Sequence, residues 1–263
     1  MRVHKTDHRP HLLLVPAEIR QHIYTYLFDD GGSRWIKIQN KPAARRSTKY
    51  HVAERTSMFH QRFYETTYQL GDAAIELHPA IMSVCRQLYL EASYALYGRH
   101  DFEFGQDVQA VVPFLADRVP LTLPLVMGIG VYKRGPRSGL GCTSEKNEWS
   151  FMCRYLLSSS TLKRLRVVVE TGRPSQPWDG VQELSAADIR LLSLIGHESL
   201  EWVRELAQVK MLEEVEVVPD EKYLPVPESS AMAVYAALSA SVNDGLVQFL
   251  KSEMERCSIT ASA

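Results

Sequence analysis

The sequence lacks the features that mark several broad classes of protein. No apolar run approaches the roughly 20 residues of a membrane-spanning helix, and the apolar run at 12–15 is too short for the core of a signal peptide. The 30 basic and 31 acidic residues give a formal net charge of −1, which offers no overall attraction to nucleic acid or anionic lipid. We therefore expect a soluble protein of the cytoplasm or the nucleus, with no membrane partner.

Cysteine is scarce and scattered. The four cysteines are Cys85, Cys142, Cys153 and Cys257, and none of them forms a CxxC pair or has a histidine partner at the spacing of a zinc site. Such a set suits a reducing compartment. We expect neither a metal nor any other cofactor.

Catalytic motifs are missing as well. The sequence contains no GxSxG or HExxH motif and no DxD-type pair of acidic residues that would bind a metal. The glycine-rich stretch 133–146 contains neither the GxxxxGK[ST] pattern of a phosphate-binding loop nor a GxGxxG that opens a helix. These absences argue against an enzyme.

The most informative stretch lies at residues 12–28 and reads LLLVPAEIRQHIYTYLF. Pro16 suits the first turn of a helix because its missing N–H would be unpaired there, and Glu18 suits the positive end of the helix dipole. The spacing predicts an amphipathic helix whose apolar stripe consists of Ile19, Ile23, Tyr26 and Leu27.

A second helix is predicted over residues 81–98, which read IMSVCRQLYLEASYALYG. Gly98 suits its carboxyl end. Its apolar stripe consists of Ile81, Val84, Cys85, Leu88, Ala92, Ala95 and Leu96. The alternation of apolar and polar residues over 100–104 predicts a strand directly after it.

Together these two stretches resemble the fungal F-box-like proteins. The matching patterns are LPxEIRxxIYxYL, which begins here with Val15 in place of leucine, and CRQxYxEAxxxLYG, which runs from Cys85 to Gly98. The resemblance covers residues 1–105. It implies docking on the Skp-type adaptor protein of a cullin–RING (SCF) ubiquitin ligase, with the rest of the chain presenting an unknown protein substrate.

In this hypothesis, the first helix would bind in a groove of the adaptor through its apolar face and the chain that enters it. The expected contact residues are Leu14, Val15, Pro16, Ile19, Ile23 and Leu27. The same stripe is also a candidate for packing against residues 81–98, and one stripe cannot face both partners fully. The alternative is a non-catalytic scaffold or regulator in which both helices serve only as core.

A long insertion, residues 29–80, separates the two helices. Alternation predicts a short strand at 34–39, with 73–78 as its candidate partner strand. Residues 41–62 are basic and contain aromatic side chains, a mixture that also occurs in nucleic-acid-binding segments. An exposed insertion is the favoured interpretation, and nucleic acid is the least favoured partner.

After residue 105, predicted helices alternate with predicted strands. The strands are expected at 125–131, 162–170 and 212–218, and the helices at 107–115, 148–157, 186–195 and 200–209. Residues 229–257 are expected to form one long helix, or two short ones separated at Asp244-Gly245. TLKRLRVVVE and MLEEVEVVP resemble degenerate leucine-rich-repeat strands. We therefore predict an α/β (or α+β) fold in two units. The first is an F-box-like module at 12–105, and the second is an LRR-like region at 106–263, an irregular sheet backed by helices.

Two loops, 133–146 and 171–184, follow predicted strands. In a parallel sheet both would emerge at the carboxyl edge, where α/β folds commonly bind ligands. Their candidate substrate-facing residues are Arg134, Arg137, Arg173 and Trp178. Ordinary solvated loops are the alternative.

Overall fold

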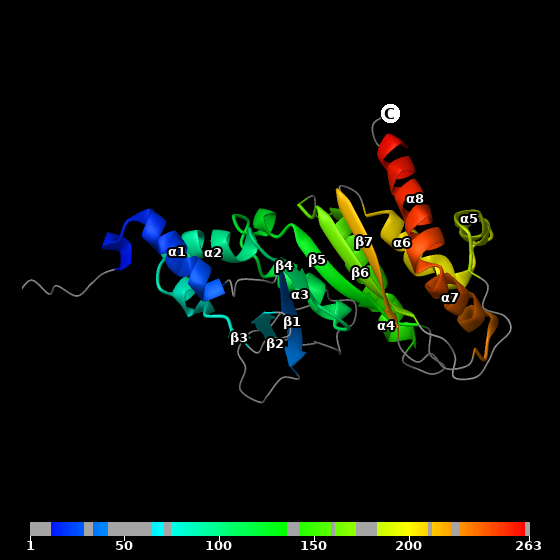
Figure 1. Ribbon diagram of the computed structural model, residues 1–263, viewed down its shortest axis with the longest axis horizontal. Helices are drawn as coiled ribbons and strands as arrows, with labels where there is room; N and C mark the ends of the chain where they lie inside the picture. Colours follow the sequence, from blue (N-terminus) through cyan, green and yellow to red (C-terminus); the bar gives the residue numbers. More distant parts are fainter. Residues whose placement is uncertain are drawn as a thin grey trace, which may run out of the picture.

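The computed structural model of the chain describes residues 12–28, 34–41, 65–70, 75–135, 142–158, 161–171, 183–209, 212–221 and 227–260. They form an elongated molecule with α1 (Ala17–Phe28) and α2 (Arg86–Tyr97) at one end and α5 (Ala186–Leu194) at the other (Figure 1). Strands and helices alternate along most of the chain, so the predicted α/β class is confirmed.

The strands of the described residues form one sheet of seven, in the order β3-β2-β1-β4-β5-β6-β7. From β1 through β4, β5 and β6 to β7 all neighbours are parallel, whereas β2 runs antiparallel to both β1 and β3. The bounds are β1 Trp35–Lys41, β2 Glu65–Leu70, β3 Ile75–Glu76, β4 Asp101–Glu103, β5 Gly128–Lys133, β6 Arg164–Thr171 and β7 Glu214–Glu221.

Helices connect the parallel strands in sequence. α3 (Val111–Ala116) follows β4, α4 (Cys142–Ser158) follows β5, and α5 and α6 (Glu201–Ala207) follow β6. α7 (Ser230–Ala240) and α8 (Val247–Thr260) come after β7. This is the series of helix and strand that the sequence predicts for residues 106–263.

The helices pack against one face of the sheet. Along β6, the alternate residues Leu165, Val167 and Val169 are buried, whereas Arg164 and Arg166 between them stay partly exposed. Because successive side chains of a strand point to opposite faces, one face is apolar and the other charged. The alternation is unusual for a parallel sheet, which commonly has helices on both faces.

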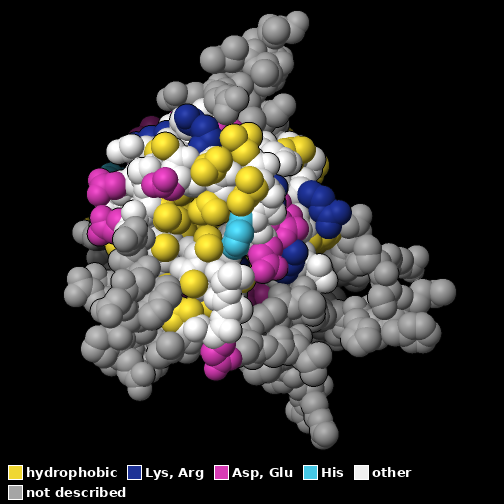
Figure 2. All heavy atoms as spheres, turned by 90° about the vertical axis from the view of Figure 1, so that its right-hand side faces the viewer, with side chains coloured by type: hydrophobic (Ala, Val, Ile, Leu, Met, Phe, Trp, Pro, Cys, Tyr) yellow, Lys and Arg dark blue, Asp and Glu magenta, His cyan; other side chains and the backbone are white. Residues whose placement is uncertain are grey.

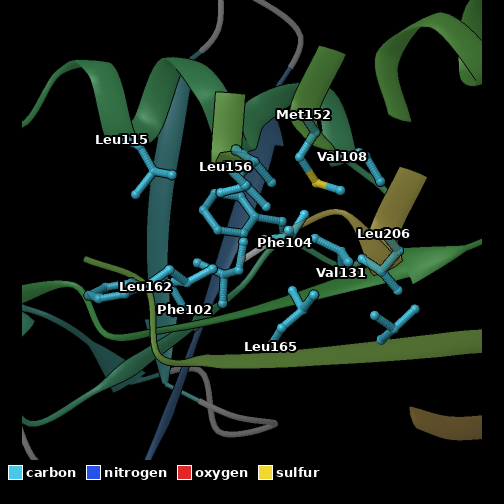
Figure 3. Packing of buried hydrophobic residues seen from close by; sticks show 14 of the residues in the cluster. Phe102, Phe104, Val108, Leu115, Val131, Met152, Leu156, Leu162, Leu165 and Leu206 are labelled. Atoms are coloured by element: carbon cyan, nitrogen blue, oxygen red, sulfur yellow. The ribbon is translucent and has the colours of Figure 1, made fainter. Parts of the chain in front are cut away.

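Aromatic rings fill the layer between the sheet and the helices. Phe102 of β4 and Phe104, just after it, lie among side chains from α4, α6 and the neighbouring strands (Figure 3). The ring of Phe114 on α3 lies 5.0 Å from that of Phe102 and 5.2 Å from that of Phe104, measured between centroids. The core therefore continues without a break from the N-terminal strands into the later ones.

On the charged face, Gly128 leaves room for a buried carboxylate. A Cβ atom at Gly128 would lie 2.2 Å from Oδ1 of Asp101, which is 1% exposed. Asp101 forms ion pairs with Arg164 at 2.7 Å and with Arg34 at 3.0 Å. The glycine in this strand thus allows a buried acid to be paired by two arginines, as a buried charge requires.

One strand pairing predicted from the sequence is wrong. The strand at 34–39 is present as β1, but its antiparallel partner is Glu65–Leu70, and Ile75–Glu76 pairs with that strand instead. Residues 65–70 read ETTYQL, whose threonines and tyrosine favour strands. The prediction missed this strand because it follows directly on the basic segment and carries little apolar alternation.

Element boundaries differ from the predictions elsewhere as well. β5 begins at Gly128 rather than residue 125, because residues 123–125 form a 3-10 turn. α4 begins at Cys142, inside the stretch predicted as a loop. Of the two alternatives for 229–257, the one with two helices is present, since a π-helical turn over Val242–Leu246, which contains Asp244-Gly245, joins α7 to α8. Gly245 permits this turn because a Cβ there would lie 2.1 Å from the Leu184 carbonyl oxygen.

The predicted boundary near residue 105 falls inside this single sheet. β4, on one side of it, pairs with β5 on the other through Phe102 and Ile129. The described residues include no helix with the length and hydropathy needed to cross a membrane.

Candidate functional site

The N-terminal helix α1 packs on α2 with a face that the sequence did not indicate. Arg20, Tyr24 and Phe28 are buried, at 7%, 0% and 1% exposure. The predicted stripe is therefore wrong as a core face, because Ile19 is 50% exposed and Tyr26 is 85% exposed. The row of Ile19, Ile23 and Leu27 lies about 100° around the helix from the buried row.

Arg20 can be buried because each of its three guanidinium nitrogen atoms donates a hydrogen bond. Its Nε and Nη2 atoms donate to the two carboxylate oxygens of Glu91 on α2, at 2.8 and 2.7 Å, and Nη1 donates to the carbonyl oxygen of Val15. The Tyr24 hydroxyl donates to the same carboxylate at 2.9 Å, and so does the Gln87 side chain. This bidentate pairing fixes both the angle of α1 on α2 and the chain that enters α1.

The hydrogen bonds of this network change the acidity of its members. The Arg20 guanidinium, more than any other group, lowers the pKa of Glu91 to about 2, and the bonds from Gln87 and Tyr24 act in the same direction. Burial is the main cause that raises the pKa of Tyr24 to about 12, and its hydrogen bond to the Glu91 carboxylate adds to it. Glu91 is therefore charged and Tyr24 neutral at physiological pH.

The predicted contact residues lie just before α1 and along a row of α1 beside the buried one, and they differ in exposure. Leu14 is 82% exposed and Pro16 is also exposed, while Val15, Ile23 and Leu27 are half-buried. Leu27 packs partly against the hydrophobic core. The structure thus brings Leu14 and Ile19 to the surface as apolar side chains around the start of α1.

The stripe predicted for the second helix is correct except at one residue. Leu88, Ala92, Ala95 and Leu96 are buried, but Val84 is 66% exposed. The predicted helix is divided into a 3-10 turn over Pro79–Ser83 and α2, with Cys85 extended between them. Val84 precedes that extended residue, so the helical spacing does not carry across.

A pocket of about 210 Å³ lies at the carboxyl edge of the sheet, beyond the end of β5. Two indole rings form part of its wall, those of Trp149 on α4 and Trp202 on α6, which meet edge to face at 5.7 Å between centroids. The Lys133 ammonium lies 5.6 Å from the centre of the Trp149 ring. Among the predicted substrate-facing residues, Arg134 lines this pocket, whereas Arg137, Arg173 and Trp178 lie outside the described residues.

Hydrogen bonds between buried groups connect the elements around this pocket. The Tyr235 hydroxyl on α7 donates to the carbonyl oxygen of Glu170 at 3.2 Å, and the Gly135 N–H donates to the Glu170 carboxylate at 3.0 Å. Burial raises the pKa of Tyr235 well above its ordinary value, so its hydroxyl stays protonated. These hydrogen bonds join β6, α7 and the end of β5, which are far apart in the sequence.

Sequence reasoning did not single out Trp149, Trp202 or Tyr235. Each lies on a different helix, and only the crossing of α4, α6 and α7 brings them together. The basic segment 41–62, the other candidate surface, lies outside the described residues except for Lys41.

The fold and these surfaces define an α/β protein whose parallel sheet carries helices on one face, with a pair of helices at one end. The chain belongs to the family described as domain of unknown function (DUF7730), whose sequence pattern matches residues 5–218. No curated protein and no solved structure was found to match it. The family match ends within β7, before α7 and α8.

Proposed function

We propose that this protein is a non-catalytic interaction protein of the F-box type. In this proposal α1 binds the Skp-type adaptor of a cullin–RING ubiquitin ligase, and the sheet and later helices present a protein substrate. Exposed apolar residues on α1 carry the proposal, because Leu14 and Ile19 point away from the core while the same helix is fixed on α2 by Arg20.

The residues of α1 that pack on the core and the residues proposed to bind the adaptor lie in two different rows of the helix. A single stripe cannot serve both core and partner, but α1 packs through Arg20, Tyr24 and Phe28. The neighbouring row remains available for helix-in-groove binding, in which apolar anchors at helical spacing enter a partner's groove. The proposed contact residues are Leu14, Val15, Pro16, Ile19, Ile23 and Leu27.

We expect Leu14, Ile19 and Pro16 to contribute most of the adaptor contact. Leu27 already packs partly on the core, so its burial on binding adds less new apolar contact. The free thiols of Cys85 and Cys153 support an action in the cytoplasm or the nucleus, where disulfides are rare.

Direct binding to a purified Skp-type adaptor tests this function. We expect wild-type protein to bind and Ile19→Asp to bind at least about tenfold more weakly, because a charge would enter an apolar groove. The matched control is Val84→Asp, which places the same charge on another exposed apolar residue. Circular dichroism and urea unfolding of each variant report on the fold.

The opposite result has a definite meaning. If well-folded wild-type protein does not bind the adaptor, the proposal fails, and the α1–α2 pair serves a scaffold or regulator as core only. If Val84→Asp weakens binding as much as Ile19→Asp, the contact does not lie on the α1 surface.

A further inference from the structure

Helix α5 presents apolar side chains on two faces. Ile189 is fully buried, yet Leu191, Leu194 and Ile195 are 61%, 79% and 68% exposed. Figure 2 looks at this end of the molecule and shows hydrophobic side chains gathered in one patch, with acidic side chains beside it. We refer to Leu191, Leu194 and Ile195 as the α5 patch.

The α5 patch is held on a fixed helix. Ser185 and Asp188 form a capping box at its start, in which the Ser185 hydroxyl accepts from the Asp188 N–H and the Asp188 carboxylate accepts from the Ser185 N–H. Arg190 donates to the Ser252 hydroxyl on α8 at 3.1 Å. A patch on a fixed helix is pre-organised for binding, because a partner need not order it.

The pocket at the carboxyl edge begins close to this patch. Glu198, which lines the pocket, follows Ile195 by three residues, so their Cα atoms lie at most about 11 Å apart. Glu198 is exposed, and within the described residues it has no ion pair. The α5 patch and the pocket therefore lie near each other.

The lining of the pocket carries one more carboxylate than cations: Glu145, Glu198, Glu201 and Glu205 face Lys133, Arg134 and Lys146. Arg134 donates a hydrogen bond to the neutral Gln106 side chain. Glu145 pairs with Lys133, and Glu201 pairs with Lys146. Glu205 accepts a hydrogen bond from the Ser150 hydroxyl and, like Glu198, has no cationic partner in the part of the chain that the structure describes.

The Trp202 indole also lines the pocket. Its side chain is 7% exposed, and its Nε1–H is buried with no acceptor among the described residues. The faces of indole rings attract cations.

We propose that the α5 patch and this pocket together bind a polypeptide segment in which apolar side chains stand beside arginine or lysine. The apolar side chains cover Leu191, Leu194 and Ile195, and the cation enters the pocket toward Glu198, Glu205 and the indoles. This surface lies at the opposite end of the molecule from α1, so the inference does not depend on adaptor docking (Figure 1).

Fluorescence anisotropy with three labelled peptides tests the proposal on the full chain. The first peptide alternates pairs of leucine with arginine, the second has glutamate in place of each arginine, and the third has serine in place of each leucine. We expect the first to bind at least about tenfold more tightly than the other two. Its binding should also change the fluorescence of Trp149 and Trp202.

Matched variants locate the site. Leu191→Ser with Leu194→Ser should weaken binding of the first peptide about tenfold, and Glu198→Gln with Glu205→Gln should weaken it several-fold. Leu157→Ser and Glu214→Gln are the controls, since both residues are exposed and lie outside the patch and the pocket. The proposal is overturned if the three peptides bind alike, if none binds, or if the control variants weaken binding as much as the site variants.

Discussion

Individual residues decide how α1 is attached, and Glu91 is the most consequential of them. It accepts hydrogen bonds from Arg20 and Tyr24 of α1 and from Gln87 of its own helix. A single carboxylate thus connects helices whose paired residues, Arg20 and Glu91, are 71 positions apart. In the resemblance to F-box-like proteins, Arg20 and Glu91 are both motif residues, and here they serve the packing of the two helices.

At this scale we predict a pH-dependent loss of stability. Because folding lowers the pKa of Glu91 from 4.5 to about 2, its charge stabilises the fold fully above pH 4.5, and this contribution is lost as the pH falls toward 2. Glu91→Gln should cost about 2 kcal/mol of unfolding free energy at neutral pH and progressively less in acid. Urea unfolding across this pH range measures the difference.

The control for this prediction is Glu18→Gln on the exposed side of α1. Its difference from wild type should be small at neutral pH, because Glu18 is exposed. A cost of Glu91→Gln that remains constant from neutral pH down to pH 2 would contradict the assigned role.

At the scale of the element, α1 has one row of residues for the core and another for the surface. Phe28→Ala should lower the unfolding free energy by about 3–5 kcal/mol, because Phe28 is 1% exposed and its removal leaves a cavity. Tyr26→Ala, two residues away and 85% exposed, should change it by less than about 0.5 kcal/mol. Denaturant unfolding measures both effects. If the two substitutions lowered the unfolding free energy equally, the assignment of the core face of α1 would be wrong.

At the scale of the whole molecule, one core joins the N-terminal strands to the later helices. Cys153 on α4 reports on it, since its side chain is 3% exposed and burial raises the pKa of its thiol to about 12. In a variant with serine at the other three cysteines, Cys153 should react with a thiol reagent only as fast as the protein unfolds. Labelling rates measured against urea concentration should follow unfolding measured by circular dichroism.

A fast reaction of Cys153 without urea would show that α4 separates from the sheet while the rest stays folded. A variant that keeps only Cys85, which is half-buried next to α2, serves as the comparison and should react faster.

The sequence by itself determined the α/β class, the two N-terminal helices and the later series of helices and strands. These follow from periodicity, because local spacing of apolar residues selects helix or strand. The sequence also named Leu14 and Ile19 as candidate contact residues, and both are exposed, although it offered the stripe containing Ile19 to both core and partner.

Only the tertiary structure decided which face of α1 is buried, because Arg20 becomes a core residue through a carboxylate 71 positions away. The pairing of β1 with β2 and the meeting of Trp149 with Trp202 are likewise long-range contacts between separate elements. Local spacing carries no information about such partners. A charged side chain can be buried when the fold places an opposite charge beside it, and only the folded chain determines which residue provides that charge.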